Sequence, residues 1–119
     1  MPKALIVDDS PAELANLRNI LSEAGWQTST ASNGNEAVAK ARSEKPNLIL
    51  CDIIMPDMDG FEACRQLQAD PQTKSIPVVF VSSKNQKADQ LWAKMQGAKA
   101  LIGKPYEAAQ IIETLKAFD

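Results

Sequence analysis

The strongest constraint on the fold is a fivefold alternation of short apolar runs with amphipathic segments. A run that is apolar throughout is typical of a strand buried on both faces, and such strands form parallel sheets that helices cover on both sides. The relatively polar second run indicates a strand near an edge. The predicted strands are Lys3–Val7, Trp26–Ala31, Leu48–Cys51, Pro77–Val81 and Lys99–Ile102.

Local signals mark the intervening helices. Ser10-Pro11-Ala12-Glu13 has the form of a capping box with proline at the first helical position, and Gly25 stands where that helix ends. Asn33-Gly34 turns the chain into the second helix, which stops before Pro46. The apolar residues at helical spacing are Leu14, Leu17, Leu21 and Ala24, then Ala37, Val38 and Ala41, then Phe61, Cys64 and Leu67, then Ala88, Leu91, Trp92 and Met95, and finally Ile111, Ile112, Leu115 and Phe118.

Five strand–helix units in 119 residues fit one α/β domain. Because crossovers between parallel strands are right-handed, few topologies remain open. We expect a flavodoxin-like, doubly wound parallel sheet of five strands in the order 2-1-3-4-5, with five helices. No linker, low-complexity tract or further repeat breaks the pattern, so residues 1–119 are expected to form a single domain with no output domain.

The composition excludes several classes of protein. The net charge is −2 and Lys and Arg form no stripe, which argues against nucleic acid as a partner. No apolar run approaches the roughly 20 residues that span a bilayer, and the N-terminus lacks a secretion signal, so we expect a cytoplasmic protein without membrane insertion. Cys51 and Cys64 are expected to be reduced core thiols. The absence of histidine excludes Ser-His and Cys-His catalysis and an internal phosphohistidine.

Acidic residues gather at the carboxyl ends of two predicted strands. Asp8 and Asp9 follow the first strand and Asp52 follows the third, and these neighbouring strands flank the reversal of strand order where ligands bind. The fourth strand brings Ser82 to the same rim, and Lys104 follows the fifth. Three close carboxylates hold a proton or recruit a cation, and such oxygen ligands suit Mg²⁺.

A divalent ion and the Lys104 ammonium beside a carboxylate are what in-line phosphoryl transfer requires. Asp52 could be the nucleophile, and the Ser82 hydroxyl could bond a phosphoryl oxygen. Taken singly, each of these residues has an ordinary explanation as a helix cap, a turn or a solvated side chain. Their joint placement at the ends of different strands favours a phosphoryl-transfer site.

These residues carry a resemblance to a known family. Asp8-Asp9, the run from Asp52 to Gly60 (DIIMPDMDG), Ser82 and Lys104-Pro105 resemble, in order and spacing, the receiver domain of two-component response regulators. The match extends over essentially the whole chain. The segment Val81–Asp89, with Trp92 and Gln96-Gly97-Ala98, is most similar to the small regulators of type IV pilus twitching motility.

The resemblance implies specific roles at the site. Asp52 would be the phosphorylated residue, Lys104 would contact the phosphoryl oxygens, and Ser82 would close on them. A cis peptide bond is usual in the family before the proline at position 105. The Mg²⁺ ligands would be Asp9, Asp52 and the backbone carbonyl of Ile54, with Asp8 acting through water.

The resemblance also implies partners. A histidine kinase would donate the phosphoryl group in trans, and a downstream protein would bind the face built from the fourth helix, fifth strand and fifth helix. The chain would be no enzyme beyond catalysing its own phosphorylation and dephosphorylation. Trp92 could help to form the docking surface, and Ile54 and Lys84 lie where side chains could gate the hydrolytic water.

Several alternatives stay open from the sequence. The chain could be a phosphate sink for a shared kinase, or a receiver fold that binds partners without phosphorylation. A haloacid-dehalogenase-like phosphatase is disfavoured because Ile54 stands where a second aspartate is needed, and a flavin carrier lacks its phosphate loop. One position departs from the family: Leu101 replaces the usual switch aromatic, and Tyr106, beyond Lys104-Pro105, is not expected to take over that role.

Overall fold

A computed structural model describes residues 1–119 and contains one parallel sheet of five strands, in the order β2-β1-β3-β4-β5. The predicted fold class, strand order and edge position of the second strand are confirmed. The strands are β1 (Lys3–Val7), β2 (Gln27–Ala31), β3 (Leu48–Cys51), β4 (Val78–Ser82) and β5 (Ala100–Gly103). The helices are α1 (Pro11–Glu23), α2 (Gly34–Glu44), α3 (Gly60–Ala69), α4 (Lys87–Met95) and α5 (Ala108–Leu115).

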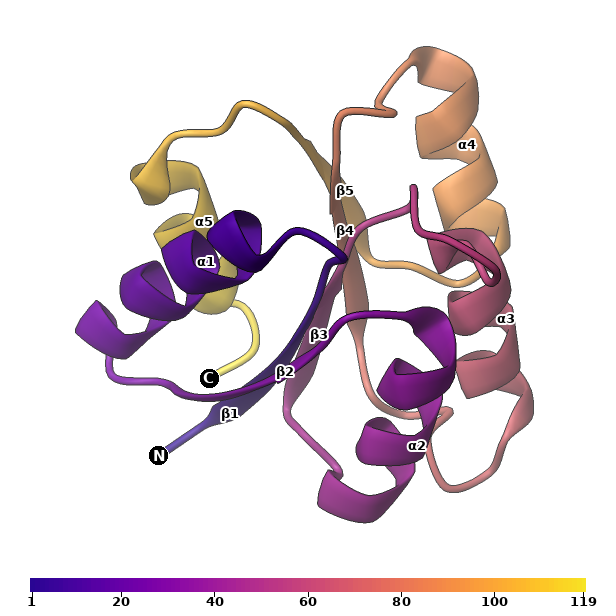
Figure 1. Ribbon diagram of the computed structural model, residues 1–119, viewed down its shortest axis with the longest axis horizontal. Coiled ribbons are helices and arrows are strands. Elements are labelled where there is room, and N and C mark those ends of the chain that lie inside the picture. The colour runs from indigo at the N-terminus through magenta and orange to yellow at the C-terminus, as the bar shows by residue number, and fades with distance from the viewer.

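The helices cover both faces of the sheet. Figure 1 shows α1 and α5 on one face and α2, α3 and α4 on the other. Because successive strand residues point to opposite faces, Leu5 and Val7 pack under α2 and α3, whereas Ala4 and Ile6 pack under α1 and α5. Cys51 and Cys64 are buried free thiols on the α2–α4 side, as expected. None of the helices combines the length and apolar character needed to cross a membrane.

Helix caps fix where the first two helices begin. Ser10 accepts a hydrogen bond from the Glu13 backbone N–H at 3.3 Å, and Asn33 accepts one from the Glu36 N–H at 2.8 Å. Such bonds satisfy backbone donors that the first helical turn leaves free. The predicted starts of α1 and α2 are therefore confirmed. The predicted capping box is only half formed, because the Ser10 N–H donates to Asp8 and not to the Glu13 side chain.

Three strands differ from the prediction by one residue at one or both ends. Trp26 is buried but precedes β2, and both β4 and β5 begin and end one residue later than expected. The shift places Ser82 within the sheet, where it pairs with Gly103. The backbone carbonyl of Ser82 accepts a hydrogen bond from the Lys104 N–H at 3.0 Å, so the sheet itself fixes the position of Ser82.

The apolar spacing in the fourth helix does not mark the residues that α4 buries. Trp92 is 48% exposed, and Ala88, Leu91 and Met95 are exposed as well. The buried residues of α4 are Asp89 and Ala93. Asp89 accepts a hydrogen bond from the Gln86 N–H at 2.9 Å, and its carboxylate forms an ion pair with Lys84 at 3.0 Å. These polar contacts set the rotation of the helix and leave an apolar patch, here defined as Ala88, Leu91, Trp92 and Met95, in solvent.

Two more residues at apolar helical spacing, in other helices, are exposed. Ala24 is exposed because it is the C-cap of α1, beyond the last helical residue. Ile112 is 37% exposed, since Ile111 and Leu115 are the residues with which α5 contacts the sheet.

Candidate functional site

The carboxyl ends of β1 and β3 bring three carboxylates together. Val7 and Cys51 are paired in the sheet, so the residues that follow them emerge side by side. One carboxylate oxygen each from Asp8, Asp9 and Asp52 lies within 4.8 Å of the other two. Asp8 and Asp52 are buried, whereas Asp9 is exposed. The predicted convergence of these three side chains is thus present in the structure.

Lys104 joins two of these carboxylates. Its Nζ atom lies 2.8 Å from Oδ2 of Asp8 and 3.0 Å from Oδ2 of Asp52. The residue directly follows β5, and the peptide bond from Lys104 to Pro105 is cis, as the family resemblance implied. One ammonium group therefore bridges an aspartate that follows β1 and an aspartate that follows β3.

Burial changes the proton affinity of both partners. Burial raises the pKa of the Asp8 carboxyl, and the hydrogen bond from Lys104 offsets only part of this effect. Burial also tends to lower the pKa of Lys104, but its bonds to Asp8 and Asp52 outweigh it, so the pKa of the amine lies above its usual value. The ammonium therefore stays charged, and the Asp8 carboxyl binds a proton more readily than an ordinary aspartate does.

The backbone around Asp52 is tightly packed. Its N–H donates to the Val7 carbonyl at 2.9 Å, and its Oδ1 accepts a hydrogen bond from the Ile54 N–H at 3.2 Å. A Cβ atom added to Gly60 would lie 2.3 Å from the Asp52 carbonyl oxygen, so only glycine fits there. In the sequence Gly60 only ends the run that begins at Asp52, and nothing there shows that α3 meets the end of β3 at this residue.

Ser82 stands beside Lys104 and is completely buried. Its Oγ atom accepts a hydrogen bond from the Lys84 N–H at 3.2 Å, and it makes no hydrogen bond with the three carboxylates. Asn85 donates from Nδ2 to the Ser82 carbonyl at 3.3 Å and fills the space over Gly103. The sequence did not reveal a role for Asn85, because only the fold places its side chain over Gly103 of β5.

Ile54 and Lys84 both lie at the edge of the site. The Ile54 side chain is 54% exposed. The Lys84 side chain is 47% exposed and its ammonium is paired with Asp89. Both side chains therefore face solvent beside the buried aspartate and serine two residues before them.

A second polar cluster next to the site was not predicted. Tyr106 follows Lys104 by two residues, and its hydroxyl donates to the Glu13 carboxylate and accepts from Asn16 Nδ2 at 2.8 Å. No local signal in the sequence reveals this contact, since Glu13 and Tyr106 are 93 positions apart.

Comparison with known proteins decides the family. The response regulator receiver domain matches residues 4–116. The chain belongs to this family. Protein PilH of Pseudomonas aeruginosa is 44% identical over 117 residues, which cover 98% of this chain and 97% of PilH. The chemotaxis protein CheY4 of Vibrio cholerae has a TM-score of 0.93 at 30% identity, covering 100% of this chain and 99% of that one. The expected resemblance to receiver domains, and to a pilus regulator among them, is confirmed.

Receiver domains act in two-component signalling, where histidine kinases phosphorylate them and downstream targets bind them. They also bind Mg²⁺ in an acidic pocket. The receiver domain of sensor histidine kinase PA1611 from Pseudomonas aeruginosa has a magnesium ion in its active-site cleft. It covers 98% of this chain with a TM-score of 0.90, but at 22% identity the likeness shows the fold alone.

The residues of this chain fit a magnesium ion. Asp8, Asp9 and Asp52 offer only oxygen atoms, which Mg²⁺ prefers, and those atoms are close enough to share one cation. The exposed position of Asp9 leaves one side open to water, and Mg²⁺ usually keeps several water ligands.

Proposed function

We propose that this receiver domain is a phosphorylation-operated switch in which Asp52 accepts a phosphoryl group from a histidine kinase. The observation that carries the proposal is the single Lys104 ammonium between Asp8 and Asp52, with Asp9 beside them. This set combines a carboxylate nucleophile, a fixed positive charge and a cation site within one pocket. Phosphoryl transfer depends mainly on such positioning and charge neutralisation.

In the proposed reaction, an Asp52 carboxylate oxygen attacks the phosphorus of a phosphohistidine on the kinase. A new P–O bond forms on Asp52 as the P–N bond breaks, and the bonding electron pair returns to the imidazole nitrogen. Lys104 holds the Asp52 carboxylate before attack and neutralises the phosphoryl oxygens afterwards. A bound Mg²⁺ supplies further positive charge, and its proposed ligands are Asp9, Asp52 and the Ile54 carbonyl, with Asp8 acting through water.

Ser82 is proposed to recognise the phosphorylated state. Its Oγ atom accepts a bond from the Lys84 N–H, so the hydroxyl proton is free to be donated. A phosphoryl group on Asp52 brings strong acceptor oxygens to the same rim of the sheet, and we expect the hydroxyl to close on one of them. This movement would shift the population between two arrangements of the surface.

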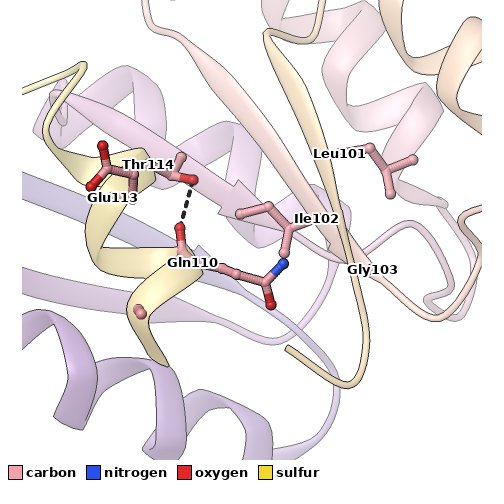
Figure 2. A pocket seen from close by; sticks show the side chains of 7 residues that line it. Leu101, Ile102, Gly103, Gln110, Glu113 and Thr114 are labelled. Carbon is pink, nitrogen blue, oxygen red and sulfur yellow. Dashed lines mark hydrogen bonds between the residues drawn. The ribbon is translucent and has the colours of Figure 1, made fainter. Parts of the chain in front are cut away.

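The proposed output face consists of α4, β5 and α5. Figure 2 shows a hollow beside β5 and α5, and Leu101 and Ile102 point to opposite sides of the strand. Leu101 is half-buried and packs against the cluster under α2 and α3, so its side chain is held in place without an aromatic ring. Gln90 and Lys94 of α4 lie beside Leu101. The apolar patch lies on the α3 side of the same helix, where it lines a hollow with Phe61, and so borders this face. We propose that a downstream protein binds here in a phosphorylation-dependent way.

The proposed biological setting is a chemotaxis-like pathway that controls twitching motility, in the cytoplasm. The 44% identity to PilH over nearly the whole chain supports it. The complete acidic site favours a phosphorylated switch over an interaction module that is never phosphorylated. A phosphate sink would use the same chemistry, and a partner that binds only the phosphorylated chain would distinguish the switch from it.

Transfer from a kinase tests the proposal. A purified histidine kinase of the same organism, phosphorylated with labelled ATP, is mixed with the wild-type chain, with Asp52→Asn and with Asp70→Asn as a control far from the site. We expect label to leave the kinase and appear on the wild type and the control, but not on Asp52→Asn. Equal labelling of all three chains would show that Asp52 is not the acceptor.

A further inference from the structure

The loop after β5 is fastened to α1 at a point outside the acidic site. The Tyr106 hydroxyl lies between the Glu13 carboxylate, to which it donates, and Asn16 Nδ2, which donates to it at 2.8 Å. The ring is half-buried and packs against the cluster under α1 and α5. Leu101, at the usual switch position, packs against the cluster on the opposite face. Tyr106 is therefore placed to act on the α1 side.

Both ends of this contact are attached to the ion pair of the site. Tyr106 is two residues from Lys104, and Pro105 between them restricts the backbone. On the other side, the Ser10 N–H donates to Oδ1 of Asp8 at 2.9 Å, and Ser10 Oγ caps the N–H of Glu13. These contacts form a closed ring. Lys104 pairs with Asp8, Asp8 binds Ser10 at the start of α1, and Glu13 of α1 binds Tyr106, which lies two residues after Lys104.

The phenol is suited to a permanent donor role. Burial, followed by the hydrogen bond to Glu13, raises the pKa of Tyr106, so the hydroxyl keeps its proton throughout the physiological range. A phenol that donates to a carboxylate makes a charge-assisted bond, which is stronger than a neutral one. This bond joins the loop that carries Lys104 to the helix that follows Asp8 and Asp9.

We propose that Tyr106 is a positioning residue, whose hydroxyl, bound to Glu13 and Asn16, sets where the Lys104 ammonium lies between Asp8 and Asp52. Without the hydroxyl, the β5–α5 loop is held only by ring packing, and Lys104 samples a wider range of positions. The consequence for phosphorylation rests on the proposed function, whereas the consequence for Lys104 itself does not.

The first test compares Tyr106→Phe, which keeps the ring, with the wild type. The rate of Asp52 phosphorylation by acetyl phosphate is expected to fall about tenfold, as small misplacements of catalytic groups do. The Mg²⁺ concentration for half-maximal rate is expected to stay the same, because the carboxylates are intact. Asn16→Ala, which removes the other hydrogen bond to the hydroxyl, should also lower the rate. Thr114→Val, which removes a similar exposed hydroxyl bond on α5, should leave the rate unchanged.

The second test needs no phosphorylation. In protein with ¹³C-labelled lysine, the Lys104 ε-methylene NMR signal is assigned with Lys104→Arg and compared between wild type, Tyr106→Phe and Asn16→Ala. A shifted Lys104 signal, with the other lysines unchanged, supports positioning even if the wild type is never phosphorylated, in which case only the proposed function fails. An unchanged Lys104 signal in both variants would overturn the inference, whether the phosphorylation rate fell or not.

Discussion

Gly60 lies against Asp52 so closely that a Cβ atom on Gly60 would stand 2.3 Å from the Asp52 carbonyl oxygen. Gly60 is the first residue of α3, and its N–H donates to the Ile53 carbonyl at 2.8 Å. The helix therefore begins directly on the backbone that carries the proposed phosphoacceptor. Asp52 directly follows the central strand β3, and the backbones of both residues are hydrogen-bonded. Neither backbone can therefore move away from the contact without a large cost in free energy.

Gly60→Ala is consequently expected to lower the free energy of unfolding by about 2 kcal/mol, the usual cost of forcing an extra carbon into a packed site. Gly103→Ala is the matched control. Its Cβ would also make a close contact, at 2.6 Å, but with the flexible end of the Asn85 side chain. Urea denaturation measures both variants. Equal losses in the two would contradict the close packing of Gly60 on Asp52.

The pH dependence of stability should reveal the free-energy cost of burying the charged Asp8 carboxylate. Burial raises its pKa above the ordinary value of 3.8, so the folded protein binds a proton more tightly than the unfolded chain does. Wild-type stability therefore falls as the pH rises through the folded-state pKa. Without Mg²⁺, Asp8→Asn should be more stable than wild type at pH 7, and the difference should shrink on acidification toward pH 3.8.

Asp70→Asn provides the control of opposite sign. The hydrogen bond from the Gln72 backbone and the bond from Arg42 hold the pKa of Asp70 below its usual value. Its contribution to stability is present at neutral pH and is lost as the pH falls through the folded-state pKa. Asp70→Asn should therefore be less stable than wild type at pH 7, and the two should converge in acid. A common pH trend for both variants would refute this account of Asp8.

Ile54 and Lys84 are expected to control the lifetime of the phosphorylated state more than the stability of the fold. Ile54 is largely exposed, so alanine there should change the free energy of unfolding by no more than about 0.5 kcal/mol. Lys84→Ala also loses the ion pair with Asp89 and should cost at most about 1 kcal/mol. Both stand two residues beyond a residue of the proposed site, where a side chain can shield the attacking water. Loss of phosphoprotein after removal of the donor measures the lifetime, and unchanged lifetimes in both variants would disprove the role.

Trp92 should be the main contact of a downstream partner on α4. It is 48% exposed and lies within the apolar patch, and tryptophans in such positions often dominate binding. Once a partner is known, Trp92→Ala should weaken binding to the phosphorylated chain about tenfold or more with the fold intact. Leu91→Ala tests whether the patch acts as a whole. If neither substitution alters the affinity measured by titration calorimetry, the patch is not the docking surface.

The strands and the acidic site could be predicted from the sequence because their signals are local. Apolar runs reveal buried strands, and Asp8, Asp52 and Lys104 each follow such a run directly. The rotation of α4 could not be predicted, since the bonds of Asp89 to Gln86 and Lys84, rather than the apolar spacing, decide which residues face inward. The contact of Tyr106 with Glu13 was also hidden, because only the completed sheet brings these distant residues together.

The central claim is that Asp52 accepts a phosphoryl group with the help of Mg²⁺, and intact-mass spectrometry tests it most directly. Wild type and Asp52→Asn are incubated with acetyl phosphate, with and without Mg²⁺, and sampled rapidly. We predict one added phosphoryl group on the wild type only, and only when Mg²⁺ is present. An adduct of equal yield on Asp52→Asn would contradict the assignment of Asp52. No adduct under any condition, even with a phosphorylated kinase as donor, would contradict the switch itself.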